Sequence, residues 1–227
     1  MTTCRRDFTG RRFTGAVAAR TAILCGTLAL LACALIFYLP FYLGLQSQVK
    51  GFALVDNIDT QPFHFFIFWG LFLFVTISFV LAHAWDVLRK RNLSRQVIIG
   101  VILIPLFPLA IWIVAELVEG AGTLFILEKF GHLLPLLLIL SLILLIIIKK
   151  SQSIGKFDNK DEKALLFVLL LLFAGFLILT GCELFFVRDL FFPWRMNTMF
   201  KLYYQVWVFM AIASSFGLYW MASRWQP

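Results

Sequence analysis

Residues 132–148 read HLLPLLLILSLILLIII, and this stretch decides the class of fold. After His132 it contains no ionisable side chain, and a run of about 17 to 25 apolar residues can cross the hydrocarbon core of a bilayer as an α-helix. Five further apolar runs lie at 21–43, 62–87, 97–117, 164–182 and 200–223. Because a helix satisfies its own backbone hydrogen bonds in lipid, the sequence predicts an all-α, polytopic transmembrane helical bundle of about six spans.

The composition of the whole chain supports this class. Of its 227 residues, 62% are hydrophobic and 14% are charged, whereas soluble domains are about 45–50% apolar and about 25% charged. These values exclude an ordinary soluble domain, a disordered protein and a coiled coil. We therefore expect a basic cytoplasmic tail over residues 1–20 and a single transmembrane helical domain over residues 21–227.

The positive charges predict the orientation in the membrane. The formal net charge is +8, and 15 of the 20 Lys and Arg residues lie in the N-terminal tail, in alternate loops or after the last span. Cytoplasmic loops carry such an excess, so both termini are predicted to be cytoplasmic in a multi-pass protein of the plasma (inner) membrane. We expect membrane lipids as partners and no nucleic acid, because the basic residues have no soluble domain to carry them.

No metal or cofactor is predicted. The four cysteines, Cys4, Cys25, Cys33 and Cys182, form no CxxC pair and have no Cys/His ligand spacing. The loops contain no Walker motif and no nucleotide-binding glycine pattern.

The segment 193–201, PWRMNTMFK, is the strongest candidate for a binding site. Asn197 or Thr198 suits the N-cap of the last helix, whose N-terminus would favour an anion at the outer membrane interface. The cations near this end are not explained by orientation, because positive charges are disfavoured outside. The sequence therefore predicts a lipid-phosphate site formed by Arg188, Arg195, Asn197, Thr198 and Lys201.

Acidic residues of the same predicted outer loops would support this site: Asp56, Asp59, Glu183 and Asp189. None of them is assigned a catalytic role. Two alternatives remain open, namely that the cations contact ordinary anionic lipids, or that they pair with Glu183 and Asp189. The aromatic residues nearby, including Trp194, Tyr203 and Trp207, could form a binding platform or the interfacial belt of a membrane protein.

Three stretches of this sequence resemble a known family. Residues 195–214, RMNTMFKLYYQVWVFMAIAS, are similar to a signature of the large YYY-type integral membrane proteins of bacteria and archaea. Residues 38–51, YLPFYLGLQSQVKG, and 61–69, QPFHFFIFW, show the same likeness, and their order resembles the C-terminal part of that family. This family is grouped with the GT-C glycosyltransferases, which use polyprenyl-phosphate sugars at the outer membrane face. The resemblance implies a membrane-embedded C-terminal module that binds a polyprenyl-phosphate-linked sugar.

The resemblance also implies an incomplete enzyme. GT-C enzymes place their catalytic acid in an early extracytoplasmic loop, and this sequence has no counterpart of that part. We therefore expect no sugar transfer by this chain without a missing N-terminal half or a partner membrane subunit. The alternatives are a non-catalytic assembly subunit and a transporter, the latter favoured by the prolines Pro105 and Pro108 in one span and disfavoured by the few ionisable groups within the spans.

The predicted topology can be tested by cysteine labelling in a variant without native cysteines. Single cysteines at Asn57 and Asp189 should react with a membrane-impermeant reagent added outside intact cells, and one at Ser153 should react only after the membrane is opened. Labelling of position 153 from outside would contradict the topology.

Overall fold

The computed structural model describes residues 7–44, 49–56, 60–89, 94–154 and 160–224. Within these residues, six helices are long and apolar enough to cross a membrane. They are α1 (Asp7–Gly44), α2 (Pro62–Arg89), α3 (Arg95–Glu119), α4 (Thr123–Ile154), α5 (Lys160–Leu184) and α6 (Met196–Arg224). The predicted all-α polytopic bundle is thereby confirmed, and the orientation of the termini stays a prediction.

The chain divides into two units, residues 1–48 and 49–227. The first unit contains α1, which begins at Asp7, within the stretch that the sequence assigned to the basic tail. Every described side chain from Thr21 to Gly44 is exposed. Within its own unit this helix therefore has no core to pack on, and its apolar side chains suit a lipid environment.

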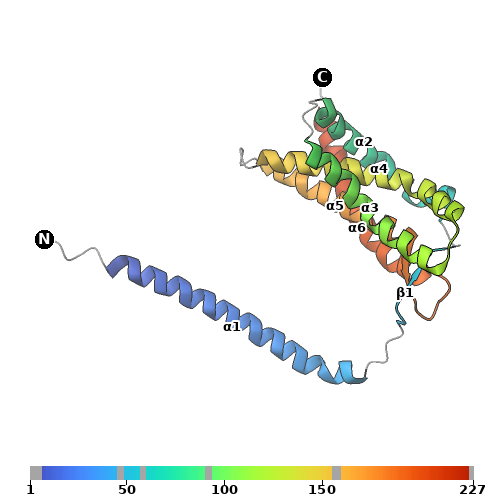
Figure 1. The fold of residues 1–227 in the computed structure, drawn as a ribbon. Helices are drawn as coiled ribbons and strands as arrows, with labels where there is room; N and C mark the ends of the chain where they lie inside the picture. Colours follow the sequence, from blue (N-terminus) through green and yellow to red (C-terminus); the bar gives the residue numbers. More distant parts are fainter. Residues whose placement is uncertain (1–6, 45–48, 57–59, 90–93, 155–159, 225–227) are drawn as a thin grey trace. The chain divides into compact units, whose positions relative to one another are not determined.

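The second unit is a bundle of five helices, α2 to α6 (Figure 1). Among them α5 is the most buried. This helix packs on α3, α4 and α6, while α2 packs on α4 and α6. Leu169, Leu172 and Phe176 of α5 are fully buried between these neighbours. In lipid such helices associate through close packing rather than by escaping water, so the shape of these side chains stabilises the bundle.

Two helix boundaries illustrate local sequence rules. Ser94 caps the start of α3, where its hydroxyl accepts a hydrogen bond from the backbone N–H of Val97 at 3.4 Å. Gly120 ends the same helix with a φ of 89°, a left-handed conformation that suits glycine. The backbone N–H of Ala121 then donates to the carbonyl of Glu116 at 2.9 Å, which closes the last turn.

The fourth span is longer than the sequence indicated. The prediction placed it at 132–148, whereas α4 begins at Thr123 and runs through Pro135. The prediction was wrong because Glu128 and Lys129 were read as loop residues. In the structure Lys129 lies inside the bundle with 2% of its surface exposed, so the helix extends by more than two turns beyond the apolar run.

A short antiparallel ribbon joins two connections that lie far apart in the sequence. Strand β1 (Phe52–Leu54) pairs with β2 (Phe185–Val187), with Ala53 opposite Phe186. Backbone hydrogen bonds extend the pairing on both sides, from Lys50 N–H to the Arg188 carbonyl at 2.8 Å and from Val55 N–H to the Leu184 carbonyl at 3.0 Å. The sequence did not predict this ribbon.

The ribbon defines one end of the five-helix bundle, which we call the ribbon end. Here α2, α4 and α6 begin and α3 and α5 end, because consecutive helices alternate in direction. The opposite end carries Lys150 of α4 and Glu162 of α5, which form an ion pair at 3.7 Å.

A pair of glycine substitutions tests the end of α3. Gly120→Ala should lower the free energy of unfolding by about 1–2 kcal/mol, because a side chain disfavours the left-handed conformation. Gly100→Ala, inside the same helix and with open space around its Cβ position, should raise it by about 0.5–1 kcal/mol. Denaturant titration in detergent micelles measures both values, and equal effects of the two variants would contradict the assigned cap.

Candidate functional site

A buried ion pair lies at the ribbon end. Nη1 of Arg195 is 3.2 Å from Oε2 of Glu183, and the two side chains are 5% and 10% exposed. Nη1 also donates to the backbone carbonyl of Cys182 at 2.6 Å. A buried charge is stable only when it is paired and hydrogen-bonded, and both conditions are met for this guanidinium.

Thr60 connects the ion pair to the start of α2. Its hydroxyl donates to Oε1 of Glu183 at 2.6 Å and accepts from Nη2 of Arg195 at 2.7 Å. Its backbone N–H donates to Oε2 of Glu183 at 3.2 Å. The three residues, which we call the Arg195 network, therefore join the beginnings of α2 and α6 to the end of α5.

The start of α6 differs from the sequence prediction. The backbone N–H of Met199 donates to the carbonyl of Arg195 at 3.0 Å, so Arg195 occupies the N-cap position. The prediction of Asn197 or Thr198 as the cap was wrong. Thr198 instead accepts a hydrogen bond from the backbone N–H of Val187 at 3.0 Å, which attaches the helix to the ribbon.

The other predicted anion-binding residues lie around Asp189. The amide of Asn197 donates to the Asp189 carboxylate, and the backbone N–H of Phe191 donates to it at 2.8 Å. These hydrogen bonds, and to a lesser extent the nearby charge of Lys201, hold the pKa of Asp189 below its usual value. Asn197 and Lys201, which were predicted to bind a lipid phosphate, therefore stabilise the anionic carboxylate of Asp189 instead.

The five predicted residues thus separate into groups. Arg195 belongs to the buried network, where the predicted alternative of pairing with Glu183 holds. Lys201 and Asn197 lie near Asp189, while the guanidinium of Arg188 lies over the ring of Phe192 at 4.9 Å. Binding of a lipid phosphate by these residues stays a prediction.

The two acidic residues predicted in the first loop are described in part. Asp56 is exposed and directly follows the ribbon at Val55. It lies close enough to Glu116, at the end of α3, for their charges to interact. Asp59 lies outside the described residues. Among the residues that the structure does describe, no group of three His, Cys, Asp or Glu side chains could hold a metal ion.

An aromatic groove lies between α2 and α6, next to the Arg195 network. It has a volume of about 660 Å³ and extends from Thr60 along both helices. Trp69 at its floor is fully buried, and the ring of Tyr203 meets it edge to face at 5.1 Å. The indole Nε1 of Trp69 has no hydrogen-bond partner among the described residues. Its remaining lining residues are His64, Phe65, Phe68, Met196, Met199, Phe200, Tyr204 and Trp207.

The groove continues into a polar mouth of about 340 Å³. The mouth shares Thr60, His64, Met196 and Met199 with the groove and adds Gln61, Trp194 and Arg195. Since α2 and α6 both begin here, the positive ends of two helix dipoles meet at this mouth. Sequence reasoning considered only the aromatic residues on the α6 side, including Tyr203 and Trp207, which were left open as a platform or an interfacial belt, and it did not include the aromatic residues of α2.

Sequence reasoning missed two ionisable residues in the bundle. Lys129 of α4 is 2% exposed, and its Nζ lies 5.8 Å from the centre of the Trp112 ring on α3. Glu116, one turn after Trp112, is 4% exposed, and its Oε1 has no hydrogen-bond partner among the described atoms. Both residues were grouped with Glu119 and Glu128 in the second predicted outer loop, although the apolar run 97–117 includes Glu116.

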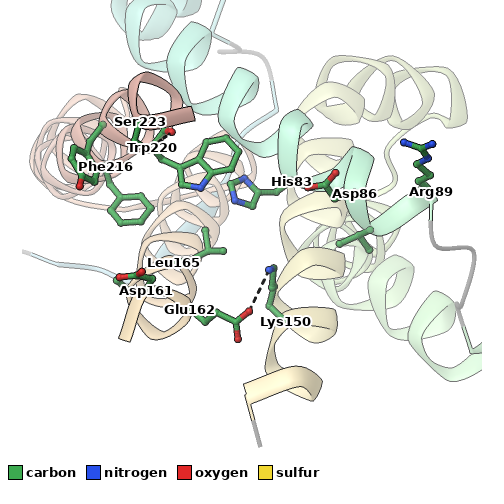
Figure 2. Close-up of a pocket in the computed structure, with 13 residues that line it drawn as sticks. His83, Asp86, Arg89, Lys150, Asp161, Glu162, Leu165, Phe216, Trp220 and Ser223 are labelled. Atoms are coloured by element: carbon green, nitrogen blue, oxygen red, sulfur yellow. Dashed lines mark hydrogen bonds and ion pairs between the residues drawn. The ribbon is translucent and has the colours of Figure 1, made fainter. Parts of the chain in front are cut away.

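A larger cavity of about 910 Å³ lies at the opposite end of the bundle (Figure 2). The ring of His83 packs against Trp220 in a tilted arrangement with centroids 4.2 Å apart, and its Nδ1 lies 3.0 Å from the carbonyl of Phe79. Lys150 and Glu162 form their ion pair at the edge of this cavity (Figure 2). Its lining contains both acidic side chains (Asp86, Asp161 and Glu162) and basic ones (Arg89 and Lys150), so its walls select for no single sign of charge.

These features define a polytopic α-helical membrane protein with a hydrogen-bonded ion pair and an aromatic groove at one end. The chain belongs to the family described as "Uncharacterized membrane protein (DUF2298)", whose sequence pattern matches residues 2–210. Comparisons with curated proteins and with solved structures gave no match.

The Arg195 network predicts a specific pattern of stabilities. Arg195→Ala should lower the free energy of unfolding by about 3–5 kcal/mol, because it leaves the Glu183 charge buried without its partner. The double variant Arg195→Met/Glu183→Leu should lose clearly less, because no unpaired charge remains. Lys201→Ala, at an exposed position of α6, should stay within about 0.5 kcal/mol of the unaltered chain. Unfolding in detergent, followed by circular dichroism, measures all three, and equal effects of Arg195→Ala and Lys201→Ala would refute the assigned role.

Proposed function

We propose that this protein binds a polyprenyl-phosphate lipid carrying a sugar, as the C-terminal module of a GT-C-like glycosyltransferase. The observation that carries this proposal is the aromatic groove between α2 and α6, which ends in a polar mouth at the beginnings of two helices. A long apolar chain with an anionic head group has the same two parts. The resemblance of residues 195–214 to the YYY-type proteins supports the same assignment.

The apolar part of the ligand would lie along α2 and α6. Phe68, Tyr203 and Trp207 offer ring faces and edges there, with Phe68 and Trp207 centroids 5.9 Å apart. Such walls suit an unsaturated chain, which gains contact with aromatic surfaces without needing hydrogen bonds. A groove open to the side of the bundle would also admit the lipid directly from the bilayer.

The phosphate would lie in the mouth, where helix N-termini and donor side chains favour an anion. Gln61 and His64 are exposed at the first turn of α2 and can donate hydrogen bonds. Arg195 lines the mouth and holds the two helices in place through Glu183 and Thr60. In this proposal Arg195 is a positioning residue, because its charge is already paired with Glu183.

The sugar would extend beyond the mouth, where Trp194 is 58% exposed. An exposed indole beside polar side chains offers an apolar face and a hydrogen-bonding rim to a sugar ring. We further propose that the ribbon end faces the outside of the plasma membrane, because the basic residues gather in the loops at the other end.

Binding of a polyprenyl phosphate to the reconstituted protein tests this proposal. His64→Ala should weaken binding about tenfold to a hundredfold, since a hydrogen bond to a charged group contributes about 1.5–3 kcal/mol. Met199→Trp, which fills the groove, should also weaken binding. Arg95→Ala at the far end of the bundle and Val208→Trp on an exposed face of α6 are the matched controls.

The non-phosphorylated polyprenol separates the two parts of the ligand. Binding of the polyprenol should be weakened by Met199→Trp and unchanged by His64→Ala, because the molecule has an apolar chain but no phosphate. If the phosphate and the alcohol bind equally, and both controls behave like the two groove variants, the proposed site does not exist.

A further inference from the structure

A second groove lies on the other side of α2, between α2 and α4. Its volume is about 430 Å³. The walls are apolar and come from both helices, with Phe66, Leu73 and Ile77 on α2 and Leu136 and Ile139 on α4. An amphiphile rather than a polar solute is therefore the kind of molecule that fits between these walls.

The end of this second groove is polar and lies at the ribbon end. Thr60, Lys129, His132 and Glu183 line it. The Lys129 side chain is 2% exposed, so a charged group is held almost fully out of water at the end of an apolar channel. Burying a cation within a membrane protein is costly, and such residues commonly mark binding sites. The Nζ of Lys129 lies over the Trp112 ring of α3, so Lys129 adds a buried positive charge behind this end, while His132 is exposed there.

The two grooves converge on the Arg195 network. Thr60 lines both of them, and Phe65 of α2 contributes to both walls. The Thr60 hydroxyl is also bonded to Glu183 and to Arg195, at 2.6 and 2.7 Å. Head groups bound at the two polar ends would therefore lie on either side of one threonine.

We propose that the α2/α4 groove binds a second, phosphate-bearing lipid whose head group contacts the exposed His132 and is attracted by the buried charge of Lys129. This inference rests on the proposed function, and it adds that the partner substrate of the lipid-linked sugar is itself carried by a lipid. The first turn of α2 then separates two lipid head groups that approach each other across Thr60. The carboxylate of Glu183 between them is balanced by Arg195, so it does not repel either phosphate as an isolated charge would.

The number of lipids bound per chain tests this inference. The full chain is exchanged into micelles containing phosphatidylglycerol in tenfold excess, polyprenyl phosphate is added, and bound molecules are counted by native mass spectrometry. Two polyprenyl phosphates should bind to the unaltered chain. Gly131→Phe should remove one of them, since Gly131 lines the α2/α4 groove and has open space around its Cβ position.

Gly100→Phe is the matched control, because Gly100 is also helical with open space around its Cβ position but lies on α3. It should leave two lipids bound. Ile139→Trp, farther along the α2/α4 groove, should also remove one bound lipid. Agreement between the two variants would show that the lipid is not lost through a local folding defect at Gly131. A single bound lipid in the unaltered chain, or two in both groove variants, would overturn the inference.

The same count distinguishes this inference from the proposed function. Loss of one lipid in Met199→Trp but none in Gly131→Phe supports the α2/α6 site and refutes the second groove. Loss in Gly131→Phe alone supports the second groove and refutes the α2/α6 site. Displacement of the second lipid by the excess phosphatidylglycerol would identify an ordinary membrane-lipid contact and would also refute the inference.

Discussion

The burial of one ion pair at the ribbon end constrains the rest of this structure. A guanidinium and a carboxylate removed from water must both be neutralised and hydrogen-bonded, so Arg195 and Glu183 require Thr60 and the Cys182 carbonyl at fixed positions. This requirement determines where α2 and α6 begin relative to the end of α5. Both grooves share α2, whose beginning is positioned in this way, so their polar ends depend on the same few hydrogen bonds.

The sequence predicted the spans because apolar runs and lipid thickness are local properties of about 20 residues. It also singled out Arg195, since a cation at the predicted outer end has no role in orientation. Its pairing with Glu183 remained only one of the alternatives, because a contact between residues at the end of α5 and the start of α6 depends on how the helices pack. Lys129 and the ribbon were missed for a related reason: a charged residue next to a span resembles a loop, and three-residue strands carry no distinctive pattern. Neither groove could be predicted, since each arises from the side chains of two helices.

Helix α2 has aromatic residues around much of its circumference, and its neighbours give them different roles. Trp69 and Phe79 are fully buried in the core, whereas Phe66 and Phe68 are exposed along the two grooves. In a bilayer the exposed faces are in contact with lipid whether or not they bind it specifically. Specificity must therefore come from the polar ends, where His64 and Lys129 differ in burial and in charge.

The ribbon also has a consequence for the order of assembly during synthesis. Its two strands are separated by more than 130 residues, and the second strand leaves the ribosome only after four of the bundle's five helices have been made. Segments emerge from the N-terminus onward, so the early strand must wait without its partner while α2 to α5 enter the membrane. The ribbon can therefore close only after β2 has been made, and the ion pair only after Arg195 follows at the start of α6.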